Sequence, residues 1–308
     1  MPTQETNPEP TDQPSAAVCA SPAGVPVPEQ AVQTPDFVEQ HRPALEQDEV
    51  RHNLILANLG RLAAGHPPDL LRWTLGAPGA CAVQAPGYPI VLGELTRAQC
   101  RALADQTRDL DYPGVVGPDR TAQWFAESAT ALGLAFLEPI PQQIQVLRDK
   151  RDKPNYPGAP GHARVIGPAD VELFADWTVA FMREAVPHDP VPGRERLAQA
   201  AGEGRHLVWV VDGEPVSIAG IVRRTRQTAA IAGVYTPPAL RGRGYAGSVT
   251  AAVVERIFAE GKSAACLYTD LRNPASNRCY RKIGFEPACR SWHYLRARAA
   301  GQQGRGMT

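Results

Sequence analysis

The sequence has no excess of either charge and no long apolar run. Its 308 residues contain 32 lysines and arginines and 32 aspartates and glutamates, so the formal net charge is zero. A nucleic-acid or membrane surface is usually bound through a basic patch, and no such bias is present here. No apolar stretch approaches the roughly 20 residues of a membrane span. We therefore expect neither nucleic acid nor membrane as a partner.

Cysteine is scarce and its spacing is uninformative. The six cysteines include no C-x-x-C pair and no metal-ligand spacing, so reduced thiols are the simplest interpretation and no metal is expected. The first lysine or arginine is Arg42, and no compact apolar segment precedes it, so the N-terminus does not look like a signal peptide. We expect a cytoplasmic protein.

Composition divides the chain into two tails, two structured regions and a linker. The first 36 residues contain eight prolines and almost no large apolar side chain, which predicts a disordered tail. A stretch rich in proline and glycine interrupts the chain near its middle and is typical of a linker. The expected segments are a tail at 1–36, an N-terminal α/β domain at 37–153, a linker at 154–162, a second domain at 163–298 and a tail at 299–308.

The N-terminal domain alternates helical and strand patterns. Helices are expected at Gln47–Ala64, Thr96–Leu110 and Arg120–Leu132, and strands at Leu70–Leu75, Ala80–Gln84, Ile90–Leu92 and Ile140–Leu147. Thr96 and Gln99 have capping-box spacing at the start of the second helix. Gly114–Arg120 holds the place that Val234–Ala246 holds in the second domain, although it lacks paired glycines. One interpretation is a degenerate copy of the same fold with no cofactor site left.

The second domain has a clearer order. Strands are expected at Ala163–Ile166, His206–Val211, Val216–Arg223, Ala229–Tyr235, Ala264–Asp270 and Trp292–Arg296. Helices are expected from Pro168, at Ala246–Glu260 and at Ala275–Ile283, with a further turn or two at Leu197–Ala201. Asp212 and Gly213 mark a hairpin turn. A second hairpin carries Arg223, Arg224 and Arg226, which is more typical of a solvated turn than of a phosphate site. This order predicts an α/β (α+β) fold with a mixed, largely antiparallel sheet flanked by helices.

The most informative stretch lies between the strand that ends near Tyr235 and the helix that follows. Pro237 and Pro238 cannot donate to a sheet ladder, so strand pairing must stop there. Gly242 and Gly244 then allow a sharp turn whose N–H groups can point at one ligand. The helix N-terminus adds unpaired donors and a partial positive charge. The stretch predicts a phosphate-binding loop; a plain glycine-rich helix cap is the alternative.

The same glycines also spell the dinucleotide-binding pattern G-x-G-x-x-G, from Gly242 to Gly247. That fingerprint should follow its strand immediately, yet six residues, two of them prolines, separate Tyr235 from Gly242. Too little chain follows Asp270 to complete a doubly wound sheet. An NAD(P)-dependent oxidoreductase is therefore disfavoured.

At these residues the sequence resembles the GNAT superfamily of N-acyltransferases. Arg241, Gly244 and Ala246 fit the pyrophosphate motif Q/R-x-x-G-x-G/A. Asn273 to Phe285 fits a second segment of the family, N-x-x-[AS]-x-x-x-Y-x-K-x-G-F. The resemblance covers about 163–298 and implies a GNAT-type fold, which the N-terminal half could repeat in tandem as a degenerate copy.

The resemblance also implies a co-substrate and a set of site residues. Acetyl-CoA would bind its pyrophosphate on the loop and its pantetheine arm along the strand edge, and Tyr280 would protonate the departing thiolate. A backbone N–H at Val234 or Tyr235 could stabilise the oxyanion, and Asn273 caps a helix and could touch the cofactor. The expected cofactor-binding residues are Val234, Tyr235, Thr236, Arg241, Gly242, Arg243, Gly244, Tyr245, Ala246, Gly247 and Asn273.

A general base is the missing part. Families of this type often carry a glutamate near the strand before the loop, but residues 223–235 contain no carboxylate. The candidates elsewhere are Asp176, Glu184, His188 and Asp189, each of which could equally be a solvated surface residue. We expect transfer of an acetyl group to a primary amine of a small molecule or peptide by direct attack. The alternative is a non-catalytic CoA-binding regulatory module.

Overall fold

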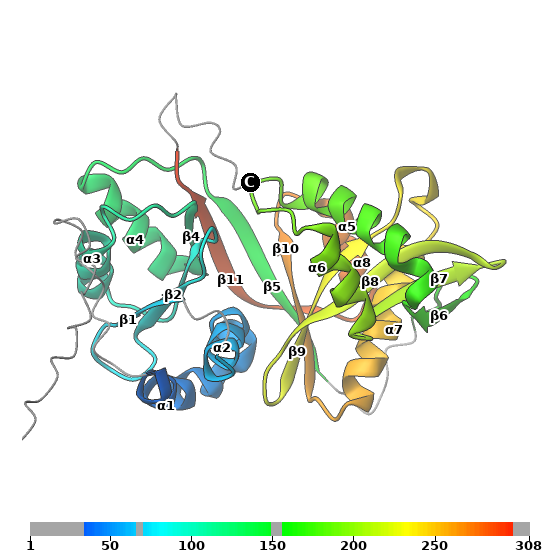
Figure 1. Cartoon of the computed structure of the whole chain (residues 1–308), viewed down its shortest axis with the longest axis horizontal. Coiled ribbons are helices and arrows are strands. Elements are labelled where there is room, and N and C mark those ends of the chain that lie inside the picture. The colour runs from blue at the N-terminus through cyan, green and yellow to red at the C-terminus, as the bar shows by residue number, and fades with distance from the viewer. Residues whose placement is uncertain (1–33, 66–69, 149–155, 298–308) are drawn as a thin grey trace, which may run out of the picture.

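The computed structural model describes residues 34–65, 70–148 and 156–297. In this part of the chain, eleven strands form one mixed sheet that runs through the molecule (Figure 1). The N-terminal strands are β1 (Leu71–Thr74), β2 (Cys81–Gln84), β3 (Ile90–Leu92), β4 (Gly114–Pro118) and β5 (Ile140–Arg148). The C-terminal strands are β6 (His162–Val165), β7 (His206–Val211), β8 (Glu214–Arg224), β9 (Thr228–Tyr235), β10 (Ala264–Asp270) and β11 (Glu286–Leu295).

Helices follow the predicted order within a few residues, with one addition. They are α1 (Thr34–Leu45), α2 (Glu49–Ala63), α3 (Arg97–Gln106), α4 (Asp119–Ala131), α5 (Val171–Ala185), α6 (Arg194–Gly202), α7 (Tyr245–Ala259) and α8 (Pro274–Ile283). Helix α1 was not expected and begins inside the predicted N-terminal tail, because Phe37 and Val38 are buried in the core beneath it. The rest of both predicted tails, and residues 154–155 of the predicted linker, lie outside the described residues.

The last strand of each half lies among strands of the other half. The order across the sheet is β1-β2-β3-β4-β11-β5-β10-β9-β8-β7-β6. Strand β5 pairs antiparallel with β10, and β11 pairs antiparallel with both β4 and β5. Figure 1 shows β11 and β5 side by side at the centre. The predicted boundaries therefore separate segments of chain that the structure joins in one sheet.

Each half contains a parallel strand pair with a helix between the two strands. The pairs are β3 with β4 and β9 with β10, connected by α3 and α7. By this order β4 corresponds to β10, and residues 93–96 correspond to the loop after β9. The expected match of Gly114–Arg120 with Val234–Ala246 is therefore wrong by one strand and one helix. Glycine and proline follow an apolar run at both places, and this local signal does not distinguish one strand end from the next.

Helices cover both faces of the sheet. Helix α7 packs on Ile231 and Leu267 on one face. Ala230 comes directly before Ile231, and Cys266 directly before Leu267, so both point to the opposite face because side chains alternate along a strand. Helix α2 packs on these two residues through Val50. Helices α5 and α6 cover β7 and β8 on this second face. The C-terminal ends of β9 and β10 thus lie between α5 on one side and α7 and α8 on the other.

The start of α2 fastens the two halves together through a buried carboxylate. Glu49 Oε2 accepts hydrogen bonds from Thr225 Oγ1 (2.6 Å) and from the backbone N–H groups of Gln227 (2.8 Å) and Thr228 (3.0 Å). Glu49 is 6% exposed. A buried carboxylate that accepts three hydrogen bonds fixes the β8–β9 hairpin against the N-terminal half.

The basic hairpin between β8 and β9 is also a structural tie. Its three arginines each contact a partner on another element, and two of these partners belong to the N-terminal half. The contacts run from Arg223 Nε to Asn53 Oδ1 (3.0 Å), from Arg224 Nε to Glu260 Oε2 (2.9 Å) and from Arg226 Nε to Glu46 Oε2 (3.6 Å).

Among the described residues, no helix combines the length and the apolar character needed to cross a membrane. Among the same residues, no group of three or more histidines, cysteines, aspartates and glutamates is arranged to hold a metal ion.

Candidate active site

The parallel pair β9 and β10 separates toward its C-terminal end. The last paired residues are Ile231 and Leu267, although β9 continues to Tyr235 and β10 to Asp270. The backbone groups of β9 that face β10 beyond Ile231 therefore have no ladder partner. Val234 and Tyr235 lie on this free edge, at the place where the sequence predicts that an extended ligand could pair.

A glycine bulge accompanies the separation. Gly233 has a φ of 64°, in the left-handed region that favours glycine. Beside it, the pairing of β9 with β8 shifts register between Ile218 and Gly220. A bulge bends and twists its strand, so β9 turns away from β10 after this point. The sequence analysis did not identify the bulge, although an isolated glycine inside a strand pattern is its usual signal.

The end of β9 is held from the side of β8. Ser217 Oγ donates to the carbonyl oxygen of Tyr235 (2.9 Å) and lies 2.9 Å from Thr236 Oγ1. The Tyr235 ring packs against Trp177 of α5, with the ring centroids 6.2 Å apart. These contacts leave the opposite edge of β9 open while they fix its position.

The glycine loop ends in a helix without a side-chain cap. Gly242 and Gly244 have φ values of 81° and 86°, and Gly244 is the N-cap of α7. No side chain accepts from the first turn, so the N–H groups of Tyr245, Ala246 and Gly247 have no partner within the helix. The space where a Cβ of Gly242 would lie is open. Convergent donors beside open space fit an anion such as a diphosphate.

The two arginines of the loop are placed differently. Arg241 Nε donates to the carbonyl oxygen of Thr236 (2.9 Å), and its Nη2 lies 2.6 Å from Glu184 Oε2. This guanidinium therefore links the loop to β9 and α5, and Arg241 can serve a diphosphate through its backbone. Arg243 is exposed.

Helix α8 starts beside the separated strands and is firmly positioned. Asn273 caps it by accepting from Ser276 N (3.1 Å), as expected. Asn277 Oδ1 accepts from Thr269 Oγ1 of β10 (2.7 Å) and from Gln145 Nε2 of β5 (3.0 Å). A strand from the N-terminal half thus helps to fix the helix that carries Tyr280.

Tyr280 lies on α8 within the apolar cluster beneath α7. Its ring contacts Phe285, with the centroids 6.0 Å apart, and the residue is half-buried. Burial raises the pKa of the Tyr280 phenol above its ordinary value. The phenol keeps its proton at neutral pH and can act as a donor. Because its proton is held more tightly than that of a thiol, donation to a thiolate requires close approach and concerted timing.

The four candidate bases divide into two groups. Asp176 and Glu184 are each bound to an arginine, at 2.6 Å in both cases. His188 lies in the loop after α5, with Nε2 3.9 Å from Asp189 Oδ1. Its ring centroid is 4.8 Å from that of His293 on β11. The second group therefore places the His188 imidazole beside a carboxylate and a second imidazole.

His293 is a candidate that the sequence analysis missed. It is 6% exposed, its Nε2 has no hydrogen-bond partner, and burial lowers its pKa to about 4. The neighbours Trp292 and Tyr294 pack with α3 and α4, so His293 points to the opposite face, toward α5. Alternation along β11 could have shown its face, but the contact with His188 joins positions 105 residues apart.

The segment after α5 bridges the separated strands. Glu184 contacts the loop at the end of β9, whereas His188 contacts β11. The strand order places β10 and β5 between them, a distance of about 14 Å at ordinary strand spacing. Ala185 is the last residue of α5, and Val186 to Asp189 form a turn in which Asp189 N donates to the carbonyl oxygen of Val186 (3.0 Å). The end of α5 and this turn therefore reach from the loop after β9 to β11, on the face opposite α7 and α8.

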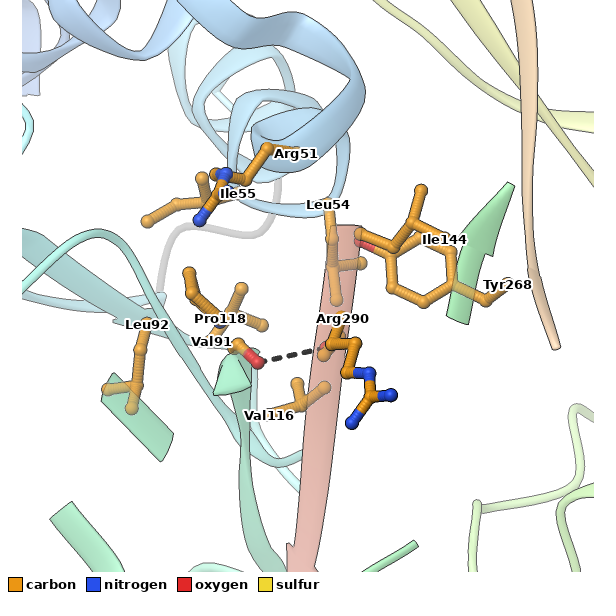
Figure 2. A pocket seen from close by; sticks show the side chains of 12 residues that line it. Arg51, Leu54, Ile55, Val91, Leu92, Val116, Pro118, Ile144, Tyr268 and Arg290 are labelled. Atoms are coloured by element: carbon orange, nitrogen blue, oxygen red, sulfur yellow. Dashed lines mark hydrogen bonds between the residues drawn. The ribbon is translucent and has the colours of Figure 1, made fainter. Parts of the chain in front are cut away.

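A small cavity lies elsewhere, beneath α2 (Figure 2). Arg51, Leu54 and Ile55 of α2 form one wall, and residues of β3, β4, β5, β10 and β11 form the rest. Arg51 Nη1 is bound to Glu94 Oε1 at 2.8 Å. None of the predicted site residues lines this cavity, so it is separate from the candidate active site.

Residues 171–285 match the model of the acetyltransferase (GNAT) family. No curated protein matches the chain. Its fold is similar to that of a GCN5-related N-acetyltransferase from Kribbella flavida, with 16% identity and a TM-score of 0.59 over 81% of this chain and 96% of that one. A Drosophila protein has 13% identity and a TM-score of 0.60 over 86% and 97%.

A third similar structure is a tandem GNAT protein from the clavulanic acid biosynthesis pathway, determined without acetyl-CoA. It has 15% identity and a TM-score of 0.53 over 85% of this chain and 95% of that one. Because each match covers more than four fifths of this chain, the similarity of fold includes the N-terminal half. The chain thus carries an acetyltransferase domain of the GNAT family at residues 171–285.

Proposed function

We propose that the protein is a cytoplasmic, metal-independent N-acetyltransferase that transfers an acetyl group from acetyl-CoA to a primary amine of a small molecule or peptide. The observation that carries this proposal is the juxtaposition at the end of β9. A free strand edge and an uncapped helix N-terminus lie there, after the bulge at Gly233, and Val234 and Tyr280 pack against the same apolar cluster. These elements match the three parts of the donor, namely an amide-bearing arm, a diphosphate and a thioester.

Each part of acetyl-CoA has a partner in this arrangement. The N–H groups of Gly242 to Gly247 bind the diphosphate, since the first turn of α7 has no side-chain cap and the space beside Gly242 is open. The pantetheine amides pair with the free edge of β9 as an added strand would. The backbone N–H of Val234 or Tyr235 stabilises the oxyanion. Asn273, which caps α8, adds a contact to the cofactor.

The transfer forms a carbon–nitrogen bond and breaks the carbon–sulfur bond of the thioester. The amine nitrogen attacks the acyl carbon from the face on which the turn after α5 lies. His188 accepts the proton that leaves the nitrogen, and buried, neutral His293 positions its ring. Tyr280 donates a proton to the departing sulfur, and solvent restores both groups.

Release of free thiol from acetyl-CoA with a panel of primary amines tests the proposal. We expect turnover with at least one amine, and Tyr280→Phe should lower kcat about 100-fold while the affinity for acetyl-CoA changes little. Tyr88→Phe, in the turn between β2 and β3, is the matched control and should leave both unchanged. An unaltered rate in Tyr280→Phe would remove the assigned acid.

The same experiment addresses the non-catalytic alternative. The absence of a carboxylate on β9 is the observation that favours a CoA-binding regulatory module. Such a module would bind acetyl-CoA yet release no thiol with any amine above the level of Tyr280→Phe. Failure to bind acetyl-CoA at millimolar concentration would contradict both functions.

A further inference from the structure

The connector between the halves lies across the first turn of α7. Its described part is Tyr156–Gly161, immediately before β6. Ala159 N donates to Ser248 Oγ (2.7 Å), and Trp209 Nε1 donates to the carbonyl oxygen of Pro160 (2.9 Å). Ser248 is 3% exposed. Two hydrogen bonds to separate elements therefore fix the connector in place over the helix.

Tyr156 occupies the space that a side chain at position 247 would need. A Cβ added to Gly247 would lie 2.0 Å from Tyr156 Oη and 3.4 Å from Cys279 Sγ of α8. Glycine within a helix costs about 1 kcal/mol relative to alanine, and here its lack of a side chain makes room for the phenol. The ring of Tyr156 packs with Cys279 and Tyr280 in the same apolar cluster. The ring therefore lies between α7 and α8.

The hydroxyl of Tyr156 contacts Ser248 and makes a long hydrogen bond to the first turn of α7. It donates to the carbonyl oxygen of Gly244 at 3.4 Å, which is long for an O–H donor. That carbonyl already accepts the N–H of Ser248 at 3.0 Å. A phosphate oxygen near the first turn of α7 would be a better acceptor for this hydroxyl, because hydrogen bonds to charged groups are shorter and stronger.

We propose that Tyr156 is an additional binding residue for the acyl-CoA, with its hydroxyl donating to the diphosphate and its ring forming the wall of the channel between α7 and Tyr280. This inference rests on the function proposed above and adds a contact from the connector, outside the residues that match the family. The anchoring of the connector favours a fixed wall over a lid that must leave before the ligand enters.

Isothermal titration with CoA and with acetyl-CoA tests this inference. Tyr156→Phe removes only the hydroxyl, and we expect affinity for both ligands to fall about 10-fold, as for loss of one hydrogen bond to a charged group. Tyr156→Ala also removes the wall and should bind at least as weakly as the phenylalanine variant. The decrease should be equal for the two ligands, because the acyl end lies away from the diphosphate.

The controls separate the possible failures. Tyr88→Phe should bind as the wild type, and thermal unfolding of each variant shows whether the fold is retained. Wild-type affinity in Tyr156→Phe would overturn the role of the hydroxyl, and tighter binding by Tyr156→Ala would show that the ring obstructs the channel. With either of these two results, the proposed function would still stand if the Tyr280→Phe variant bound acetyl-CoA normally but turned over slowly. No binding of CoA by the wild type would overturn both proposals.

Discussion

The two parallel strand pairs of the sheet are followed by different connections to their helices. After β9, the chain passes through two prolines and two left-handed glycines before α7 begins at Tyr245. After β3, four residues lead directly into α3. Gly93 in this short connection has no room for a side chain, since an added Cβ would lie 2.5 Å from the carbonyl oxygen of Gly79. The first connection leaves open space, and the second is packed.

The first turns of α3 and α7 differ as well, because side chains cap the first turn of α3 but not that of α7. Thr96 caps α3 by accepting from Gln99 N (3.3 Å), and the Gln99 side chain accepts from Thr96 N (2.8 Å). Gly244 offers α7 no such cap. A helix whose first donors are satisfied by its own side chains has less to offer an anion. The acidic side chain of Glu94 stands just before α3, which further disfavours an anion there.

Each parallel strand pair is followed by a second helix, α4 after β4 and α8 after β10, and these two helices differ at one position. Tyr280 is the seventh residue of α8, and the seventh residue of α4 is Phe125. Phe125 is fully buried and packs against Tyr112, with the ring centroids 6.4 Å apart. It has no hydroxyl that could donate a proton. From this comparison we expect the shared framework to support a site in the C-terminal half, because one helix start there is left uncapped and one helix carries a phenol.

Gly244→Ala should have the largest effect, because it breaks the uncapped turn on which the comparison depends. A residue with a Cβ is strained at a φ of 86°, so relaxation will turn the N–H groups away from a common point. We expect affinity for acetyl-CoA to fall on the order of 100-fold. Titration calorimetry measures the loss. Gly261→Ala, with a φ of 78° at the other end of α7, should keep wild-type affinity.

Glu49→Ala should reveal that the halves unfold together. It removes the carboxylate that accepts from the backbone N–H groups of Gln227 and Thr228, and we expect a loss of about 3 kcal/mol in the free energy of unfolding. Because β5 and β11 are exchanged, urea denaturation should remain a single transition. Two transitions, with only one of them shifted, would show that the halves are independent. Glu46→Ala is the control, since Glu46 lies 3.6 Å from the exposed Arg226 and should contribute little.

Thr96→Ala should have the smallest effect. It tests the N-terminal half of the comparison, because it removes the side-chain cap from α3. Removal of this cap should cost about 1 kcal/mol of stability. It should not create a second CoA site, because the connection before α3 remains packed and acidic. A second binding event in the titration of this variant would contradict the argument that packing, and not capping alone, closes the N-terminal half.

Local signals predicted most of the elements. The capping box at Thr96, the Asp212–Gly213 turn and the Asn273 cap depend on residues within a few positions of one another, and all three are present. Asp212 and Gly213 both have positive φ, at 51° and 85°, as a tight hairpin requires. Such features are encoded locally and can be identified without the fold.

Long-range features could not be predicted in the same way. The exchange of β5 and β11 depends on pairing between segments more than 100 residues apart, for which neither strand carries a local signal. The side chain of Arg241 is bound by Glu184, 57 positions away. His293 contacts His188 because the strand order brings β11 within reach of the turn after α5. The assigned cofactor-binding residues and Tyr280 remain predictions, now with a geometry that can be tested.

The most direct test of the central claim is the stoichiometry of CoA binding to the full chain, measured by titration calorimetry of the wild type and Gly244→Ala. The account predicts one site per chain in the wild type and on the order of 100-fold weaker binding in the variant. Two sites per chain, or wild-type affinity in Gly244→Ala, would contradict it.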